Sequence, residues 1–348
     1  MDNEEKNIKV LIVDDSAIVR KVFTEELSKE KGIEVIGTAP DPYVARDKIV
    51  KLKPDVVTLD IEMPRMDGLT FLKKLMKYYP IPVIVVSSLT KNGSKLALEA
   101  LSIGAVEVIS KPSTSYSVGE MSVQLADKIR AVARIKVNSK PNSLEKKGVN
   151  RVLVHKYTGT IADRIIAIGS STGGTEAIKT IITSMPKNSP PVLIVQHMPA
   201  QFTTSFAERL NSICEPEVKE AEDGEEVKAG KVIIAPGNFH MLLRKKSTNY
   251  YVQIKTGPLV HHQRPSVDVL FQSIAETAGS NAVGIILTGM GVDGALGLLK
   301  MRQAGARTIA QDEQSCVVFG MPREAIKIGA AEKIISINDI AHTALNII

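Results

Sequence analysis

The stretch Ile165-Ile-Ala-Ile-Gly-Ser-Ser-Thr-Gly-Gly174 decides how the second half of the chain is interpreted. The mostly apolar, β-forming run from Arg164 to Ile168 predicts a buried strand. Gly169–Gly173 then fits the pattern G-x-S-x-G, and helical spacing continues from Gly174 to Ser184. A serine on such a turn is a candidate nucleophile, because free N–H groups at the helix N-terminus can bind a developing oxyanion. A Gly-rich turn that binds phosphate, or that only turns the chain, fits the same residues.

Composition and charge describe an ordinary globular chain of 348 residues, long enough for two domains. Residues 1–125 and 161–348 carry net charges of −1 and 0, whereas residues 126–160 carry +7. Because both prospective domains are nearly neutral, we expect no nucleic-acid-binding surface. The sequence has no apolar run near the ~18 residues that span a bilayer and no signal-peptide core at its start. We therefore expect a cytoplasmic protein without membrane insertion, in which Cys214 and Cys316 are reduced.

The first 125 residues alternate between strand and helix patterns. Five strands and five helices in this order predict a flavodoxin-like, doubly wound parallel sheet. The expected strands are 8–13, 33–36, 55–59, 83–86 and 106–109. The clearest helices are expected at 42–52 and 68–78.

Polar residues follow the ends of these strands, namely Asp14, Asp15, Asp60, Ser87 and Lys111. The carboxyl ends of parallel strands share one edge of the sheet, so these residues should converge. Three carboxylates in one pocket repel one another unless a hard cation joins them, and Mg²⁺ suits oxygen ligands. Asp60 would then accept a phosphoryl group, and Ser87 and Lys111 would stabilise the acyl phosphate.

These residues, with Asp60-x-x-Met-Pro-x-x-Asp-Gly68 and Lys111-Pro112, resemble the receiver domain of two-component response regulators. The resemblance covers about residues 7–125. It implies that a partner histidine kinase is the phosphodonor for Asp60. It also implies that the backbone carbonyl of Glu62 completes a metal site formed by the three aspartates.

Residues 126–154 are expected to join the two domains as a basic helix extension and a linker. Leu125–Val137 has the spacing of a basic amphipathic helix, and residues 138–150 are polar and interrupted by Pro and Gly. We therefore place the receiver-like domain at residues 1–125 and the second domain at residues 155–348.

The second domain repeats the alternating pattern and predicts another doubly wound α/β domain with a mainly parallel sheet. After the serine turn, strands are expected at 191–196, 231–235 and 282–287, a hairpin around 240–254, and helices at 203–213, 266–278 and 294–304.

A nucleophilic serine needs a base and a carboxylate that orients it. His197 and Asp293 each follow a strand pattern and should lie at the same sheet edge as Ser171. His197 would accept the serine proton, and Asp293 would fix the tautomer of His197. The backbone N–H groups that could bind the oxyanion belong to Thr172, Met290 and Gly291.

The other histidines are His155, His240, His261, His262 and His342. The adjacent pair His261-His262 could suggest a metal. However, neighbours on a strand face opposite sides, and no carboxylate or cysteine cluster accompanies the pair in the sequence.

The order Ser, His, Asp differs from that of α/β-hydrolases. The chain resembles the chemotaxis protein-glutamate methylesterases, the CheB family, in the motifs Gly169-Ser-Ser-Thr-Gly-Gly174, Gln196-His-Met-Pro199, Ala235-Pro-Gly237, Arg264-Pro-Ser-Val-Asp268 and Thr288-Gly-Met-Gly-x-Asp-Gly294. The resemblance implies the triad Ser171, His197 and Asp293. It implies hydrolysis of glutamate methyl esters on the cytoplasmic helices of chemoreceptors, with release of methanol and with deamidation of glutamines. The resemblance implies that this hydrolysis needs no cofactor. It also implies that the receiver covers the catalytic groove until the receiver is phosphorylated.

Two other classes of function are open to a chain with a receiver-like first half. A DNA-binding output domain would need a basic helix-turn-helix, which the neutral α/β-patterned second half does not suggest. A nucleotide-binding domain could use Gly169–Gly174 as a phosphate loop, but neither G-x-x-x-x-G-K-[ST] nor G-x-G-x-x-G occurs there.

Overall fold

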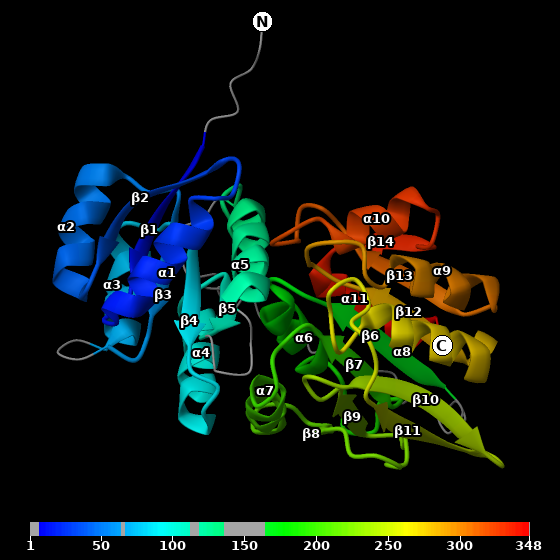
Figure 1. The fold of residues 1–348 in the computed structure, drawn as a ribbon. Helices are drawn as coiled ribbons and strands as arrows, with labels where there is room; N and C mark the ends of the chain where they lie inside the picture. The colour runs from blue at the N-terminus through cyan, green and yellow to red at the C-terminus, as the bar shows by residue number, and fades with distance from the viewer. Residues whose placement is uncertain (1–6, 64–66, 112–117, 136–163, 348) are drawn as a thin grey trace, which may run out of the picture. The chain divides into compact units, whose positions relative to one another are not determined.

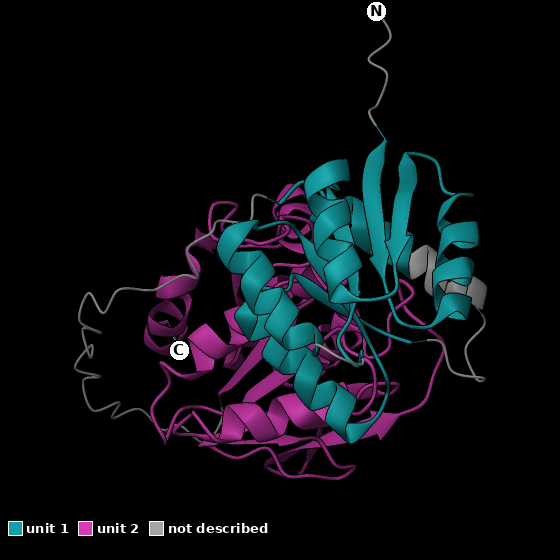
Figure 2. Ribbon diagram, turned by 90° about the vertical axis from the view of Figure 1, so that its left-hand side faces the viewer, with its two compact units in different colours: residues 1–145 teal, residues 146–348 magenta. Residues whose placement is uncertain are grey.

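A computed structural model describes residues 7–63, 67–111, 118–135 and 164–347 (Figure 1). The chain divides into two compact units, residues 1–145 and 146–348, which Figure 2 distinguishes by colour. Within the described residues, no helix has both the length and the apolar character needed to cross a membrane.

The first unit is a five-stranded parallel sheet with strand order β2-β1-β3-β4-β5, which confirms the flavodoxin-like prediction. Its elements in chain order are β1 (Ile8–Val13), α1 (Ala17–Leu27), β2 (Ile33–Ala39), α2 (Pro42–Leu52), β3 (Val56–Asp60), α3 (Gly68–Tyr78), β4 (Val83–Ser87), α4 (Lys91–Ile103), β5 (Glu107–Ser110) and α5 (Val118–Val132).

The helix α5 differs from the helix expected at Leu125–Val137, because it begins at Val118 and ends at Val132. Leu125 and Ile129 are fully buried in the core of the first unit. These two side chains are four residues apart on one helical face, and this face ties α5 to the receiver-like unit. The domain limit drawn at residue 125 therefore falls inside a helix. The polar stretch 138–150 lies outside the described residues.

The second unit contains a seven-stranded sheet in the order β14-β13-β12-β6-β7-β9-β8, and every pair in it is parallel. A separate antiparallel hairpin, β10–β11, confirms the hairpin that was expected. The elements are β6 (Ile165–Ser170), α6 (Gly174–Ile182), β7 (Val192–Gln196), α7 (Phe202–Asn211), β8 (Glu217–Glu220), β9 (Lys231–Ile234), β10 (His240–Lys246), β11 (Asn249–Lys255), α8 (Val267–Thr277), η2 (Gly279–Asn281), β12 (Ala282–Ile286), α9 (Ala295–Gln303), β13 (Arg307–Gln311), α10 (Met321–Lys327), β14 (Lys333–Ile335) and α11 (Ile337–Asn346).

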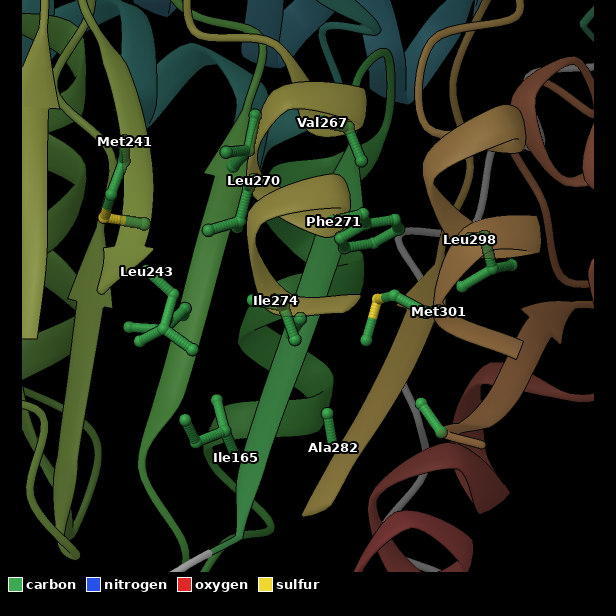
Figure 3. Packing of buried hydrophobic residues seen from close by; sticks show 14 of the residues in the cluster. Ile165, Met241, Leu243, Val267, Leu270, Phe271, Ile274, Ala282, Leu298 and Met301 are labelled. Carbon is green, nitrogen blue, oxygen red and sulfur yellow. The ribbon is translucent and has the colours of Figure 1, made fainter. Parts of the chain in front are cut away.

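The strand β6 stands at the point where the winding of this sheet changes direction. β7 pairs with one side of β6 and β12 with the other. Right-handed crossovers then place the helices that follow these strands on opposite faces of the sheet. In Figure 3, Phe271 and Ile274 of α8 lie over the strands, with Leu298 and Met301 of α9 beside them. The carboxyl ends of β12, β6 and β7 therefore meet at one place, where ligands bind in sheets of this kind.

Candidate active site

Ser171 is the first residue after β6, at the centre of this sheet edge. It is 8% exposed, and its backbone N–H donates to the carbonyl of Thr288 over 3.1 Å. Among the described non-glycine residues, those with positive φ do not include Ser171. The left-handed conformation of the turn is taken by Gly173, with φ of 79°. The serine is thus held in ordinary backbone, unlike the nucleophile on the strained elbow of an α/β-hydrolase.

His197 follows β7, the neighbouring strand, and its backbone N–H donates to the carbonyl of Ser170 over 3.1 Å. The side chain is buried, and Nε2 lies 2.8 Å from Asp293 Oδ2. Because a carboxylate only accepts, Nε2 carries the proton in this tautomer. The other ring nitrogen, Nδ1, is buried and has no hydrogen-bond partner in the described part of the chain. Nδ1 is therefore the ring atom available to take a proton from a nucleophile.

Asp293 lies beyond β12 and is 2% exposed. Besides His197, its carboxylate accepts from Ser266 Oγ (2.8 Å to Oδ1), from Val267 N–H (2.7 Å to Oδ2) and from Asp268 N–H (3.0 Å to Oδ1). Burial would raise the pKa of Asp293. The hydrogen bond and charge of His197, together with the bonds from the first turn of α8, outweigh burial and lower the pKa below its usual value. The triad acid is thus held ionised.

The loop after β12 passes close to the nucleophile at Gly289. A Cβ added to Gly289 would lie 2.7 Å from Ser171 Cβ, so the chain passes the serine closely at a position that only glycine can occupy. The carbonyl of Gly289 accepts from the N–H groups of Gly320 and Met321. In a trans peptide the next N–H, that of Met290, points the opposite way. Thr172 is buried directly after the serine. The roles of Thr172, Met290 and Gly291 as donors stay a prediction.

Gln196 is a residue for which the sequence had suggested no role. It ends β7 and is 3% exposed. Its Oε1 accepts from Ser170 Oγ over 2.7 Å, and its Nε2 donates to the carbonyls of Ser171 (2.9 Å) and His197 (3.3 Å). One buried amide therefore ties the turn of the nucleophile to the loop of the base. The signals in the sequence were its place just before His197 and at the start of the motif Gln196-His-Met-Pro199.

The expectation that His261-His262 lies on a strand without a carboxylate nearby is wrong. Both residues have positive φ in a turn, and His261 Nε2 lies 3.0 Å from Asp268 Oδ2. His261, Asp268 and Asp293 form one cluster in which one polar atom of each residue lies within 4.8 Å of the others. The sequence analysis missed this because Asp268 lies seven positions beyond His261, and a turn rather than a strand joins them.

The first unit gathers its polar residues as predicted. One oxygen each of Asp14, Asp15 and Asp60 lies within 4.8 Å of the others. Burial raises the pKa of Asp14 and of Asp60, although Lys111 opposes this in both. Asp14 Oδ2 is buried without a hydrogen bond from any described residue, with Lys111 Nζ 3.5 Å away. A buried carboxylate oxygen without a donor, in a group of three, fits a hard cation such as Mg²⁺.

Lys111 and Ser87 make different contacts in this unit. Lys111 Nζ is 2.7 Å from Asp60 Oδ2, and the N–H of Glu62 donates to Asp60 Oδ1 over 2.9 Å. Ser87 is fully buried, and its hydroxyl donates to the carbonyl of Gly93 over 3.0 Å. The lysine is therefore already at the acceptor, whereas the Ser87 hydroxyl would have to give up its bond to Gly93 of α4 to donate to a phosphoryl group. The metal-ligand role of the Glu62 carbonyl stays a prediction.

Comparison with known proteins gives the same division of the chain. Residues 166–344 match the family CheB methylesterase, and residues 10–121 match the response regulator receiver domain. The chain is 63% identical over 334 residues to a protein from Syntrophus aciditrophicus named protein-glutamate methylesterase/protein-glutamine glutaminase 2, covering 96% of this chain and 97% of that protein. It is 51% identical over 340 residues to a protein-glutamate methylesterase/protein-glutamine glutaminase from Salmonella typhimurium, covering 97% and 96%.

A solved structure supports the fold of the second unit. The CheB methylesterase catalytic domain of Thermotoga maritima is 42% identical with a TM-score of 0.53, and the match covers 54% of this chain and 100% of that one. With a receiver domain before a sheet edge that gathers Ser171, His197 and Asp293, this chain belongs to the CheB methylesterase family.

Proposed function

We propose that this chain is a cytoplasmic serine hydrolase that removes the γ-methyl esters of glutamate side chains on the cytoplasmic helices of chemoreceptors, and that it deamidates glutamines there. The observation that carries the proposal is the buried pair of His197 and Asp293 at the sheet edge where Ser171 follows β6, with Nδ1 of His197 unpaired among the described residues. The names of the curated relatives, methylesterase and glutaminase, supply the substrate class.

Acylation begins when Ser171 Oγ attacks the γ-carbonyl carbon of the ester. His197 Nδ1 takes the hydroxyl proton, and the Oγ–C bond forms as the carbonyl π pair moves to oxygen. Backbone N–H groups of Thr172 and Met290 would bind that oxyanion. When the tetrahedral intermediate collapses, the bond to the methoxy oxygen breaks and Nδ1 returns the proton to it. Methanol leaves, or ammonia from a glutamine, and a glutamyl ester remains on Ser171.

Deacylation repeats these steps with water. His197 Nδ1 removes a proton from the water, which attacks the acyl carbon, and the same proton then goes to Ser171 Oγ. Asp293 keeps its charge throughout and stabilises the imidazolium through Nε2. The lowered pKa of Asp293 suits this role, because the carboxylate stays ionised while the ring gains and loses its proton.

The receiver half would regulate this activity. A chemotaxis histidine kinase donates a phosphoryl group to the carboxylate of Asp60, and Lys111 and Ser87 hold the phosphoryl oxygens. Asp14, Asp15, Asp60 and the carbonyl of Glu62 would hold Mg²⁺, which when bound neutralises charge on the transferred group. The short contact between Lys111 and Asp60 and the raised pKa of Asp14 and of Asp60 support this site.

Methanol release from methylated receptor membranes, measured with and without a phosphodonor, tests the catalytic half. We expect release by the whole chain and a faster rate with phosphodonor. A wild-type protein that folds but releases no methanol would exclude the methylesterase activity.

Labelling with acetyl phosphate tests the receiver half. Label should enter the protein in the presence of Mg²⁺, be labile to alkali as an acyl phosphate is, and be absent after chelation or in Asp60→Asn. Label that persists in Asp60→Asn would show another acceptor.

A further inference from the structure

The N-terminus of α8, which donates hydrogen bonds to Asp293, is itself linked to α9, the helix that follows Asp293. The N-cap residue Ser266 and the first turn of α8 together offer three donors to the carboxylate of Asp293. Two of these donors are backbone N–H groups with no partner inside the helix, because the first turn has none to offer. Asp293 thus acts as a cap for α8, although it lies 25 residues beyond Asp268 in the chain.

The N-terminus of α9 is capped from the opposite direction. Its N-cap residue, Gly294, has no side chain that could accept a hydrogen bond. Instead the N–H of Gly297 donates to Asp268 Oδ1 over 2.6 Å. A Cβ on Gly297 would lie 2.7 Å from Phe271 Cβ, so glycine is needed for the two helices to come this close. Asp293, just before α9, caps α8, and Asp268, in the first turn of α8, caps α9.

This exchange also brings two carboxylates together. Oxygens of Asp268 and Asp293 lie within 4.8 Å of each other and of His261 Nε2. Burial raises the pKa of Asp268, the N–H of Gly297 opposes it, and the charge of Asp293 raises the pKa further. Two helix N-termini, each with positive partial charge, offset the repulsion between the carboxylates. Both oxygens of Asp293 already accept two hydrogen bonds each, which leaves this cluster poorly suited to a metal.

We propose that Asp268 is a positioning residue of the catalytic triad, an inference that rests on the proposed function above. Asp268 holds the start of α9 against the start of α8. It thereby fixes the loop that carries Asp293 and the N–H groups of α8 that donate to the Asp293 carboxylate. His261, which bonds the second oxygen of Asp268, holds the Asp268 side chain in this orientation. Asp268 touches no reacting atom, so its effect passes through Asp293.

The test measures kcat and KM for methanol release from methylated receptor membranes. Asp268→Ala removes the acceptor for Gly297 and should lower kcat by about 10- to 100-fold with KM nearly unchanged, because a small misplacement of a catalytic group has effects of this size. Asp268→Asn keeps an oxygen for Gly297 and should retain at least roughly a third of the wild-type kcat. Asp339→Ala removes an exposed first-turn aspartate of α11 and is the matched control, expected to have wild-type activity.

A double-mutant cycle separates positioning from a general loss of structure. In an Asp293→Asn background, Asp268→Ala should change kcat by less than about twofold, because the residue through which Asp268 acts is already impaired. An equal loss in both backgrounds, or full activity of Asp268→Ala, would overturn the proposal.

Thermal unfolding of each variant checks its folding. If Asp268→Ala does not fold, Asp268→Ser takes its place, since its shorter side chain stays polar but does not reach Gly297. All results are ratios to an active wild type. A wild type that releases no methanol would therefore count against the proposed function, and a normal Asp268→Ala beside an active wild type would count only against this inference.

Discussion

The two acidic sites of the molecule shift the pKa of their buried carboxylates in opposite directions. In the first unit, burial outweighs the help of Lys111, the pKa of Asp14 and Asp60 is raised, and Asp14 Oδ2 has no hydrogen bond within the described residues. In the second unit, the oxygens of Asp293 accept four hydrogen bonds and its pKa is lowered. Both sites stand at the carboxyl edge of a parallel sheet, so the fold alone does not set the difference.

The contrast shows which site depends on a ligand. The receiver site has negative charge that the protein does not fully compensate, and a cation or a phosphoryl group with its cation changes that balance strongly. The catalytic site has its charge compensated by protein donors and can act as it stands. A site that senses a signal is therefore left incomplete, and a site that performs hydrolysis is preorganised.

The largest effect should come from the nucleophile. Ser171→Ala is expected to lower methanol release by roughly 10⁴-fold or more, as in other serine hydrolases that lose the attacking atom. Its neighbour Ser170 is the control. Ser170→Ala removes only the hydrogen bond to Gln196 Oε1 and should keep most of the activity. Methanol release from receptor membranes measures both. Equal losses in the two variants would mean that the preorganised site has been misplaced.

The next prediction tests the role of the negative charge of Asp293, which hydrogen-bond donors of the protein compensate. Asp293→Asn should lower kcat by roughly 10³- to 10⁴-fold, because the amide cannot fix the His197 tautomer or stabilise its charge. The side-chain amide of the variant also places an NH₂ group opposite the N–H and O–H donors at the start of α8. Because two donors cannot bond each other, we expect a loss of about 1–3 kcal/mol in the free energy of unfolding. Kinetics and chemical denaturation measure the two effects. A variant with unchanged turnover would remove Asp293 from the active site.

A smaller effect concerns the link between the halves. If the unphosphorylated receiver restrains the catalytic unit, a fragment from Val152 to Ile348 should be several-fold more active than the unphosphorylated whole chain. Phosphodonor should activate the whole chain and leave the fragment unchanged. A contact worth a few kcal/mol could be rebalanced by one phosphoryl group. A fragment that is folded by circular dichroism but no faster would point to activation by positive assistance instead.

The smallest effect is on stability, and its sign follows from the raised pKa of Asp14. As pH rises from the unfolded pKa near 3.8 through the raised folded pKa, the wild type loses stability relative to a chain without that charge. Asp14→Asn should therefore raise the free energy of unfolding of the first unit at pH 7 in the absence of metal. Mg²⁺ should stabilise the wild type but much less the variant. Thermal unfolding in chelator and in Mg²⁺ measures this, and a variant less stable than wild type in chelator would contradict it.

Local sequence patterns were sufficient to predict the helices and strands that carry the two sites. The bounds of α2 and α3 agree with the prediction, because Asp41 and Asp67 cap these helices and apolar residues recur along one face. Convergence of the triad was predictable for a similar reason. Ser171, His197 and Asp293 each follow a strand, and parallel neighbours end at one edge.

Features that depend on tertiary contacts were not predictable. Nothing in the sequence shows that Asp293 would accept from the first turn of α8, or that Nε2 of His197 rather than Nδ1 would face it. These depend on how α8 packs beside α9. The chain beyond residue 304, which forms β13, α10, β14 and α11, was also missed. β14 is only three residues long, too short for a pattern of alternation to be recognised.

The edges of the seven-stranded sheet bear on how separate copies of the protein behave toward each other. Unpaired edge strands are templates onto which another chain can add a strand. Here one edge is β8, a four-residue strand with the sequence Glu-Val-Lys-Glu, and the other is the three-residue β14. Short length and charge both disfavour strand addition. A parallel sheet forms slowly because its neighbouring strands are distant in the chain. We expect these short edge strands to limit aggregation while the sheet forms.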